Sequence, residues 1–515
     1  MHLEGCTMYP QYHQMTLDDY DFPFGKLDPE NEWVKLAALV PWDVAEEEYA
    51  KQFVNNGHPA HPVRIALGAL IIKQKLKCSD EWTVRHVSEN PYLQFFLDMK
   101  SFTSKCSFGA STMVEFRKRF PPKAIAAILA ASVPRDDDHK QEPPSGGVGS
   151  ASSTPGNSGT ILMDATCCPA DVAFPQDFQL LNDAREHLEH MVDELCTSAK
   201  VKRPRMRRKC ARRDYLNLSK SKKRSAKKIR TGVRKQLQYI IRDIGFIADM
   251  IQNNGVKLSK KQANLLNTIT TLYEQQLYMY ENHTHSVEDR IVSLSQSWIR
   301  PIVRGKAHAN TEFGAKLHIS MVDGYAKIER LSFDAFNEAT DFFAAVEGYR
   351  KEHGFYPARV LADKIYRNRE IMVWCKERNI QMTGPVLGRP PKNQDKRREA
   401  RRQEYQDICD RNIVEGEFGV GKRSYGLNRI MAHLPETSFC VIGIALLCMN
   451  FAKRFRQDLD LLTKWRADPF CGKIVIGGMQ HDGTPKQTNG NAFRRYRVTD
   501  SRNPPAAEDR ADGIL

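Results

Sequence analysis

Residues 316–333, KLHISMVDGYAKIERLSF, mark the point where the chain changes from a helical to a strand periodicity. Apolar residues at 317, 319 and 321 alternate with polar ones, which is the pattern of a β-strand with two different faces. Asp323 and Gly324 follow and supply the two-residue turn of a hairpin. We therefore predict an antiparallel β-hairpin over this stretch.

Helices and strands alternate on both sides of the hairpin. Upstream, ILMD is a short apolar strand that ends at Asp164. Downstream, the pattern predicts a helix over 338–353, the strand RVLAD ending at Asp363, a helix over 368–378 and the short strand IQMT. This order predicts an α/β domain built on a mixed sheet.

Three acids in this region are candidates for catalysis. Asp164 and Asp363 each stand where a predicted strand leaves the sheet, so they can converge although they lie far apart in sequence. A third acid, Glu415, is expected on a helix with Arg411 four residues before it and Lys422 seven residues after it, near one helical face. Three carboxylates together with the scissile phosphate carry four negative charges, which balance two Mg²⁺ ions in phosphodiester chemistry, with Mn²⁺ as a substitute. We expect Arg411 and Lys422 to hold neighbouring phosphates.

Two points stay open at this stage. Glycines at 416, 419 and 421 leave open whether Lys422 lies on the helix or on a loop. Composition also leaves four further acids as candidates, namely Asp171, Asp177, Asp323 and Glu417.

Positive charge is concentrated in one block. The chain has 77 Lys or Arg against 62 Asp or Glu, and 18 of these cations lie between Lys200 and Lys235 with a single acid, Asp214. Like charges at this density repel each other unless a polyanion lies beside them, so nucleic acid is the first candidate partner. The alternative is a solvated helix face or a flexible tether. The predicted DNA contacts in this block are Arg203, Arg205, Arg207, Arg208 and Lys209.

Composition excludes several classes of protein. With 515 residues and 41% hydrophobic content, the chain is neither wholly disordered nor collagen-like. We expect no membrane helix and no secretory signal, because the apolar runs are short and the N-terminus is acidic and aromatic. The 12 cysteines show no C-x-x-C spacing, which argues against a zinc site or a disulfide framework and favours the cytoplasm.

The N-terminal part is predicted to be helical. Apolar spacing indicates short helices over about 60–120, and Thr112-x-x-Glu115 is expected to open the last of them as a capping box. This helix carries Phe116 and Phe120 with basic residues between them. It is either a DNA-recognition helix or a helix packed through its two aromatic side chains.

Four separated segments resemble a known family: LMDATCCPADVAFPQDFQLLNDARE, RPIVRGKAHANTEFGAKLHISMVDGYAKIERLSFDAFNEAT, VLADKIYRNRE and RNIVEGEFGVGKRSYGLNRIMAHLPETS. Together they resemble the DDE-class transposases of bacterial insertion sequences, above all insertion-sequence family five and its relatives. LGALIIKQKLKCSDEWTVRHVSENPYLQFFLDM, followed by STMVEFRKRF, resembles the N-terminal helical domain of those proteins.

The resemblance implies a ribonuclease-H-like catalytic domain whose metal-holding acids are Asp164, Asp363 and Glu415. Related transposases carry a tyrosine, arginine, glutamate and lysine signature around the third acid. Here the signature positions hold Ile408, Arg411, Glu415 and Lys422, so the tyrosine is not matched. This difference puts the positioning of DNA by that tyrosine in doubt and leaves the metal ligands unaffected.

The resemblance also suggests a division of the chain. We predict a separate helical DNA-binding domain over 1–134, a flexible linker over 135–160, the catalytic domain over 161–176 and 301–456, a basic helical insertion over 177–300, and a partly disordered tail over 457–515.

The expected function is that of a DNA transposase. It would bind the terminal inverted repeats of its own element as a homodimer on double-stranded DNA, and would catalyse metal-dependent strand cleavage and transfer into target DNA at the bacterial nucleoid. The alternatives are a non-catalytic DNA-binding protein derived from a transposase and a simple ribonuclease-H-like nuclease.

Overall fold

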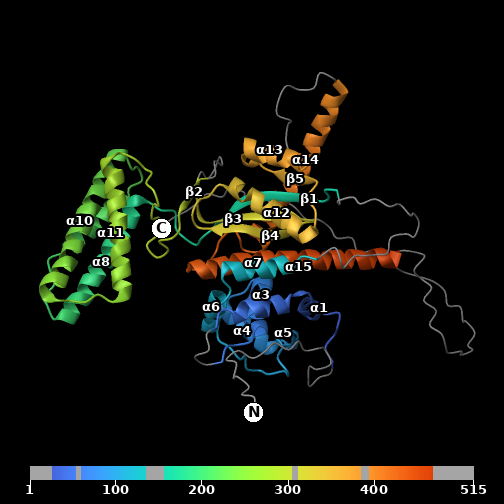
Figure 1. Ribbon diagram of the computed structural model, residues 1–515. Helices are drawn as coiled ribbons and strands as arrows, with labels where there is room; N and C mark the ends of the chain where they lie inside the picture. The colour runs from blue at the N-terminus through green and yellow to red at the C-terminus, as the bar shows by residue number, and fades with distance from the viewer. Residues whose placement is uncertain (1–25, 54–58, 135–155, 304–310, 384–393, 468–515) are drawn as a thin grey trace, which may run out of the picture. The chain divides into compact units, whose positions relative to one another are not determined.

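The structure is a computed structural model that describes residues 26–53, 59–134, 156–303, 311–383 and 394–467 (Figure 1). Most of the predicted linker, at 135–155, and the tail from 468 onward lie outside these residues. The predicted flexibility of the linker and the predicted disorder of the tail therefore stay predictions.

A mixed sheet forms the centre of the α/β region. Its strands run in the order β4-β3-β1-β5-β6, and β2 pairs with the first residues of β3. β1, β5 and β6 are parallel to one another, whereas β3 is antiparallel to β1 and β4. The strands are β1 (Thr160–Pro169), β2 (Pro301–Val303), β3 (Thr311–Val322), β4 (Tyr325–Ser332), β5 (Arg359–Ala362) and β6 (Gln381–Met382).

The predicted hairpin is confirmed. β3 and β4 pair in antiparallel register from Lys316 with Ser332 to Val322 with Tyr325. Asp323 and Gly324 form the turn with φ of 49° and 77°. Two successive positive φ angles belong to the turn type whose twist matches that of the flanking strands, and Gly and Asp adopt it readily.

Both faces of the sheet are covered by helices. On one face, Ile161, Met163 and Val360 pack with α12 (Phe342–His353) and α13 (Arg369–Glu377). On the other face, the alternate residues of β3 share a core with α15 (Pro435–Ala467). Because neither face meets water, even His318 and Ser320, on the polar side of the alternation, are buried.

In the described part of the chain before the sheet, the structure has seven helices: α1 (Glu32–Leu39), α2 (Trp42–Ala50), α3 (Val63–Leu76), α4 (Asp80–Glu89), α5 (Pro91–Phe96), α6 (Ala110–Lys118) and α7 (Pro122–Ala131). Their buried side chains belong to the same hydrophobic core as α15 and one face of β3. Asn450 on α15 bonds to Ser132 and to both backbone groups of Ala326, with distances of 3.4, 2.9 and 3.0 Å. Within the described residues, the N-terminal helices thus have no separate core of their own, in contrast to the predicted separate domain.

The helix expected at Thr112 begins earlier than predicted. α6 starts at Ala110 with Gly109 as its N-cap, and the hydroxyl of Thr112 accepts a bond from the Gly109 N–H at 3.4 Å. Thr112 is therefore the third helical residue rather than the cap. Phe116 and Phe120 are buried, which supports packing rather than DNA recognition as their role.

The predicted helical insertion contains α8 (Asp177–Ala199), α9 (Arg208–Ser219), α10 (Ala226–Asn254) and α11 (Lys260–Glu281). These helices bury a core of their own that includes Leu188, Ile240 and Ile269. Serine caps begin α10 and α11, and Gly255 ends α10 with a φ of 62°. The insertion is thus a compact helical unit.

One helix is long and apolar enough to cross a membrane, although the apolar runs were expected to be too short for that. Residues 435–457 of α15 pass that test of length and composition, with a mean hydropathy of 1.5. Two thirds of this segment is buried, against the N-terminal helices and the sheet. Its apolar composition is accounted for by its place at the centre of the protein core.

Candidate active site

The parallel pairing of β1 with β5 brings the first two acids together. The last pair of partners in the register is Met163 with Ala362, so the next residues on each strand are Asp164 and Asp363. Neighbouring strands lie about 4.8 Å apart, so these two residues start from adjacent backbones. Asp363 follows the end of β5 as predicted, but Asp164 lies inside β1, which runs on to Pro169 because it continues to pair with β3.

The third acid comes from α14 (Gln394–Ser424), which runs without a break through Gly416, Gly419 and Gly421. Arg411 connects the acids, since its guanidinium lies 3.6 Å from Asp363 and 3.3 Å from Glu415. Lys422 lies on the same helix, two turns after Glu415. The structure therefore brings Asp164, Asp363 and Glu415 into one site, around an arginine whose expected partner is phosphate.

Asp164 has an unusual electrostatic environment. Burial raises its pKa to about 6, against the opposing effects of the Ala165 N–H and Arg411. The carboxylates of Asp363 and Glu415 contribute to this raised pKa. A buried acid close to two others is a typical environment for a cation, because a positive charge relieves both the repulsion and the cost of burial.

The chemistry of these side chains suits a hard divalent cation, which takes carboxylate oxygens as ligands. Within the described residues, however, no three acidic, histidine or cysteine side chains are close enough to share one ion. The cationic group present among the three acids is Arg411. The three carboxylates are therefore the right type of ligand for a metal ion. In this structure, however, they are spaced around the guanidinium of Arg411 rather than around an ion.

Glu417, the main rival to Glu415 as the third acid, faces elsewhere. Its charge acts on Tyr425 and Lys453, whereas that of Glu415 acts on Asp164. The remaining candidate acids have local roles of their own: Asp171 pairs with Arg429 at 2.6 Å, Asp177 pairs with Arg290 at 2.6 Å, and Asp323 forms the hairpin turn.

A buried hydrogen-bonded chain next to the acids was missed by the sequence analysis. Asp341 lies 3.1 Å from Nδ1 of His318, and Nε2 of His318 lies 2.8 Å from the hydroxyl of Tyr366. Burial lowers the pKa of His318 and so favours the neutral ring, in which Nδ1–H donates to Asp341 and Nε2 accepts from Tyr366.

Tyr366 connects this chain to the candidate site. It closes the 3-10 turn Lys364–Tyr366 that starts directly after Asp363. Its pKa is raised by burial first, and then by carboxylates that include Glu338 and Asp164. A signal was present in the sequence, because polar residues at 316, 318 and 320 line one side of a strand, but only the helical cover on both faces shows that His318 is buried.

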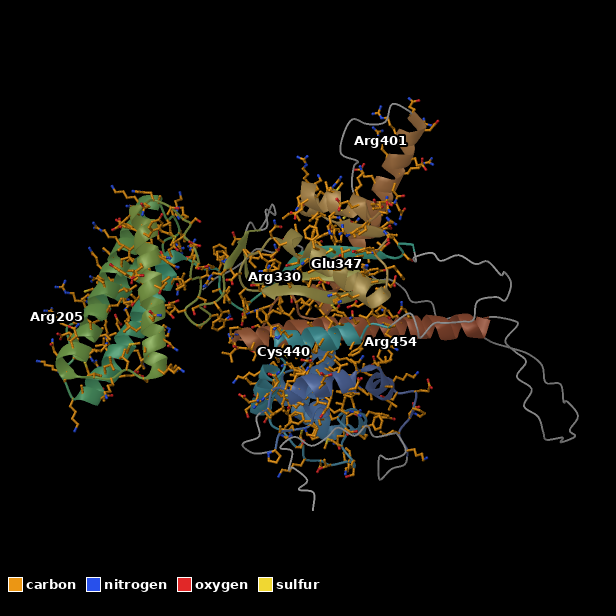
Figure 2. The ribbon with its side chains drawn as sticks, viewed as in Figure 1. Arg205, Arg330, Glu347, Arg401, Cys440 and Arg454 are labelled. Atoms are coloured by element: carbon orange, nitrogen blue, oxygen red, sulfur yellow. The ribbon has the colours of Figure 1, made fainter. Side chains whose placement is uncertain are left out.

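The basic block lies in and around α9. Arg203 and Arg208 both pair with Asp193 on α8, at 2.6 and 2.7 Å, so part of the block has acidic neighbours that are distant in sequence. Arg205, Arg207 and Lys209 are exposed, and Figure 2 shows Arg205 on the helical insertion. A shallow hollow of about 580 Å³ on α9 is lined by Lys209, Arg212, Arg213 and Lys220 together with polar and apolar neighbours. This surface has the charge of a nucleic-acid interface.

Two stretches of the chain match models of known protein families. Residues 360–452 match the family model of the transposase DDE domain, and residues 23–119 match that of a transposase domain. The first match includes Asp363 and Glu415 but not Asp164.

A curated relative from Rhizobium meliloti is described as "Uncharacterized protein ORF8 in nfe locus". It is 29% identical over 162 residues, which are 32% of this chain and 73% of the relative. No solved structure matches. The match to a transposase domain near the N-terminus and the match to the transposase DDE domain further along the chain support a DDE-class transposase of an insertion sequence.

Proposed function

We propose that this protein cuts and rejoins DNA at the terminal inverted repeats of its own insertion sequence, with Asp164, Asp363 and Glu415 as the catalytic acids. The observation that carries the proposal is the convergence of these acids, from β1, β5 and α14, on one site with a raised Asp164 pKa. The mixed sheet, with a hairpin antiparallel to its first strand and parallel strands on the other side, supports a ribonuclease-H-like fold for the domain.

The three acids would hold divalent metal, Mg²⁺ with Mn²⁺ as a substitute, and two ions would balance the charge of the three acids and the scissile phosphate together. When bound, such ions supply charge stabilisation to the attacking and leaving oxygens. Arg411 would then turn from the acids toward a phosphate of the DNA, because metal and guanidinium compete for the same carboxylates. Lys422, on the same helix, would hold a neighbouring phosphate.

The reaction consists of two phosphoryl transfers. In the first, an oxygen of water attacks the phosphorus at the end of the element, the bond to the 3′-oxygen breaks, and a free 3′-hydroxyl remains. In the second, that hydroxyl attacks a phosphodiester of target DNA, so one bond forms for each bond that breaks. No covalent protein intermediate is needed.

DNA would be held by the exposed cations of the insertion, above all Arg205, Arg207 and Lys209. Arg203 and Arg208 would contribute less, because each already pairs with Asp193. Since two ends of an element must be joined, a homodimer on DNA is the smallest assembly that serves this reaction.

The test is cleavage of labelled DNA. The purified full chain is incubated with Mg²⁺ and with DNA fragments that carry the ends of its element. It should nick these fragments at one fixed position, and nicking should stop when EDTA is added. A fragment with a scrambled end serves as control. Binding without any metal-dependent nick would favour the non-catalytic DNA-binding protein, and equal cutting of both fragments would favour the simple nuclease.

A further inference from the structure

A groove of about 700 Å³ lies where the N-terminal helices meet the segment between α14 and α15. We call it the basic groove and define it by its cationic lining: Lys73, Lys77, Arg117, Arg423 and Arg429. One carboxylate, Asp80, lines it as well. The surplus of positive charge indicates an anionic occupant.

One wall of the basic groove is rigid. Asp80 accepts two bonds from Arg117, at 3.0 and 2.7 Å, and one from Lys73 at 2.7 Å. Burial alone would raise the pKa of Asp80, but the bonds from Arg117 and Lys73 outweigh it and hold that pKa below its usual value. This carboxylate therefore stays charged and fixes two cations in place.

A hydrogen bond joins the N-terminal helices to the segment after α14 at the basic groove. Nε2 of Gln74 on α3 donates to the backbone oxygen of Tyr425, just after α14, at 2.7 Å. The matched transposase domain over 23–119 thus contacts the matched DDE domain over 360–452 at the floor of the groove. A molecule in the groove would touch both.

Two cations of the basic groove, Lys77 and Arg423, are available to bind an anion, and we call them the rim cations. Lys77 and Arg423 are exposed, and among the residues that the structure describes neither forms an ion pair. Arg429 is exposed too, although it pairs with Asp171. Met431 and Leu434 present apolar surface beside them, with 60% and 39% of their area exposed.

The basic groove is close to the candidate active site along α14. Arg423 follows Glu415 by eight residues on that helix, which is about 12 Å along its axis. DNA advances about 3.4 Å per nucleotide, so this distance corresponds to three or four nucleotides. A DNA strand that runs along α14 from a bond cut at the acids would bring a phosphate to the level of Arg423 within about three or four nucleotides.

We infer that the basic groove binds the phosphate backbone of DNA that flanks the cleaved bond, and that it does so with cations from both transposase domains. The inference rests on the proposed function for the identity of the polyanion. An acidic protein segment is the other class of partner with suitable charge. DNA is favoured because Arg423 of the groove lies on the same helix as Glu415, and because cations beside apolar side chains suit a sugar–phosphate backbone.

The experiment compares full-length variants with equal loss of charge. The double variant Lys77→Gln/Arg423→Gln removes both rim cations. Its control, Lys351→Gln/Lys376→Gln, removes two exposed lysines on α12 and α13 that form no ion pair in the described part of the chain. Binding of a short random-sequence duplex is measured without Mg²⁺ over a range of salt concentrations, and thermal melting checks that each variant is folded.

Each phosphate contact contributes about 0.9 to the slope of log affinity against log salt, so the rim variant should lose about 1.8 in slope and the control almost nothing. A rim variant with the parent's slope, or a control that loses as much as the rim variant, overturns the inference. If the parent itself binds no duplex, the proposed function fails instead. The two failures are therefore distinguishable.

Discussion

At the scale of single residues, the hydroxyl of Tyr366 bonds to the buried His318, and the charges of Asp164 and Asp363 act on it. Tyr366→Phe keeps the ring, which packs near Phe342, but removes the bond to His318. The turn after Asp363 should then lose its anchor, so we expect cleavage to fall about tenfold or more and to require more Mg²⁺, as is usual for the partners that orient metal ligands. The measurement is the cleavage rate against Mg²⁺ concentration.

The matched control is Tyr356→Phe, which removes an outer hydroxyl bonded to Glu347 and Arg350. It should leave the Mg²⁺ dependence unchanged. If Tyr366→Phe lowers the melting temperature but not the apparent metal affinity, then Tyr366 serves packing alone.

A second residue of interest is Asp243, which is fully buried in the helical insertion. Burial raises its pKa to about 6 against the opposing bonds from Arg242. Because the folded-state pKa lies above the unfolded one, this group stabilises the fold at low pH, and that contribution is lost as the pH rises through about 4 to 6. The loss amounts to about 3 kcal/mol at neutral pH.

Asp243→Asn should therefore make the insertion more stable at pH 7 and flatten its stability between pH 4 and 6. Hydrogen exchange of α10 amides in the full chain measures this directly. Asp249→Asn, on the exposed side of the same helix, is the control. A wild-type pH profile that persists in Asp243→Asn would show that another group titrates.

At the scale of elements, the contact between α7 and α15 depends on one glycine. A Cβ at Gly443 would lie 2.0 Å from the Cγ2 atom of Ile125. Gly443→Ala should therefore force the two helices apart and destabilise the protein by about 1 to 3 kcal/mol in urea unfolding. At Gly348 on α12 the added methyl would meet nothing within 4 Å, so Gly348→Ala should be neutral or slightly stabilising. Equal effects of both changes would contradict this packing.

The elements also show what sequence patterns can predict. The hairpin followed from alternation and its Asp-Gly turn, and the end of β5 at Asp363 followed from a short apolar run. The continuation of β1 beyond Asp164 did not follow, because pairing with β3 sustains that strand through a segment with no clear pattern. The continuation of α14 through its glycines was likewise left open by the sequence.

The candidate site was predictable as a set of residues but not as an arrangement. Asp164, Asp363 and Glu415 were identified from position and from resemblance. The bonds of Arg411 to two of them, and the His318 chain, depend on elements that meet only in the folded chain. Ion pairs between the basic block and α8 were hidden for the same reason.

At the scale of the whole molecule, the N-terminal helices and α15 share one core. Residues 1–134 alone would expose the side chains that pack against α15, so we expect no cooperative unfolding transition from that fragment. Residues 1–467, which include α15, should unfold cooperatively. Circular dichroism during thermal melting checks both, and a sharp transition of the short fragment would mean that these helices fold independently.

The central claim is that Glu415, with Asp164 and Asp363, forms the catalytic site, and the paired variants Glu415→Gln and Glu417→Gln test it most directly. Both lie on α14 and lose the same charge, but only Glu415 acts on Asp164. Mg²⁺-dependent nicking of labelled end fragments should fall by orders of magnitude in Glu415→Gln, with DNA binding intact, and should stay within a few-fold of the parent in Glu417→Gln. Loss of nicking in Glu417→Gln with continued cutting by Glu415→Gln would contradict the site described here.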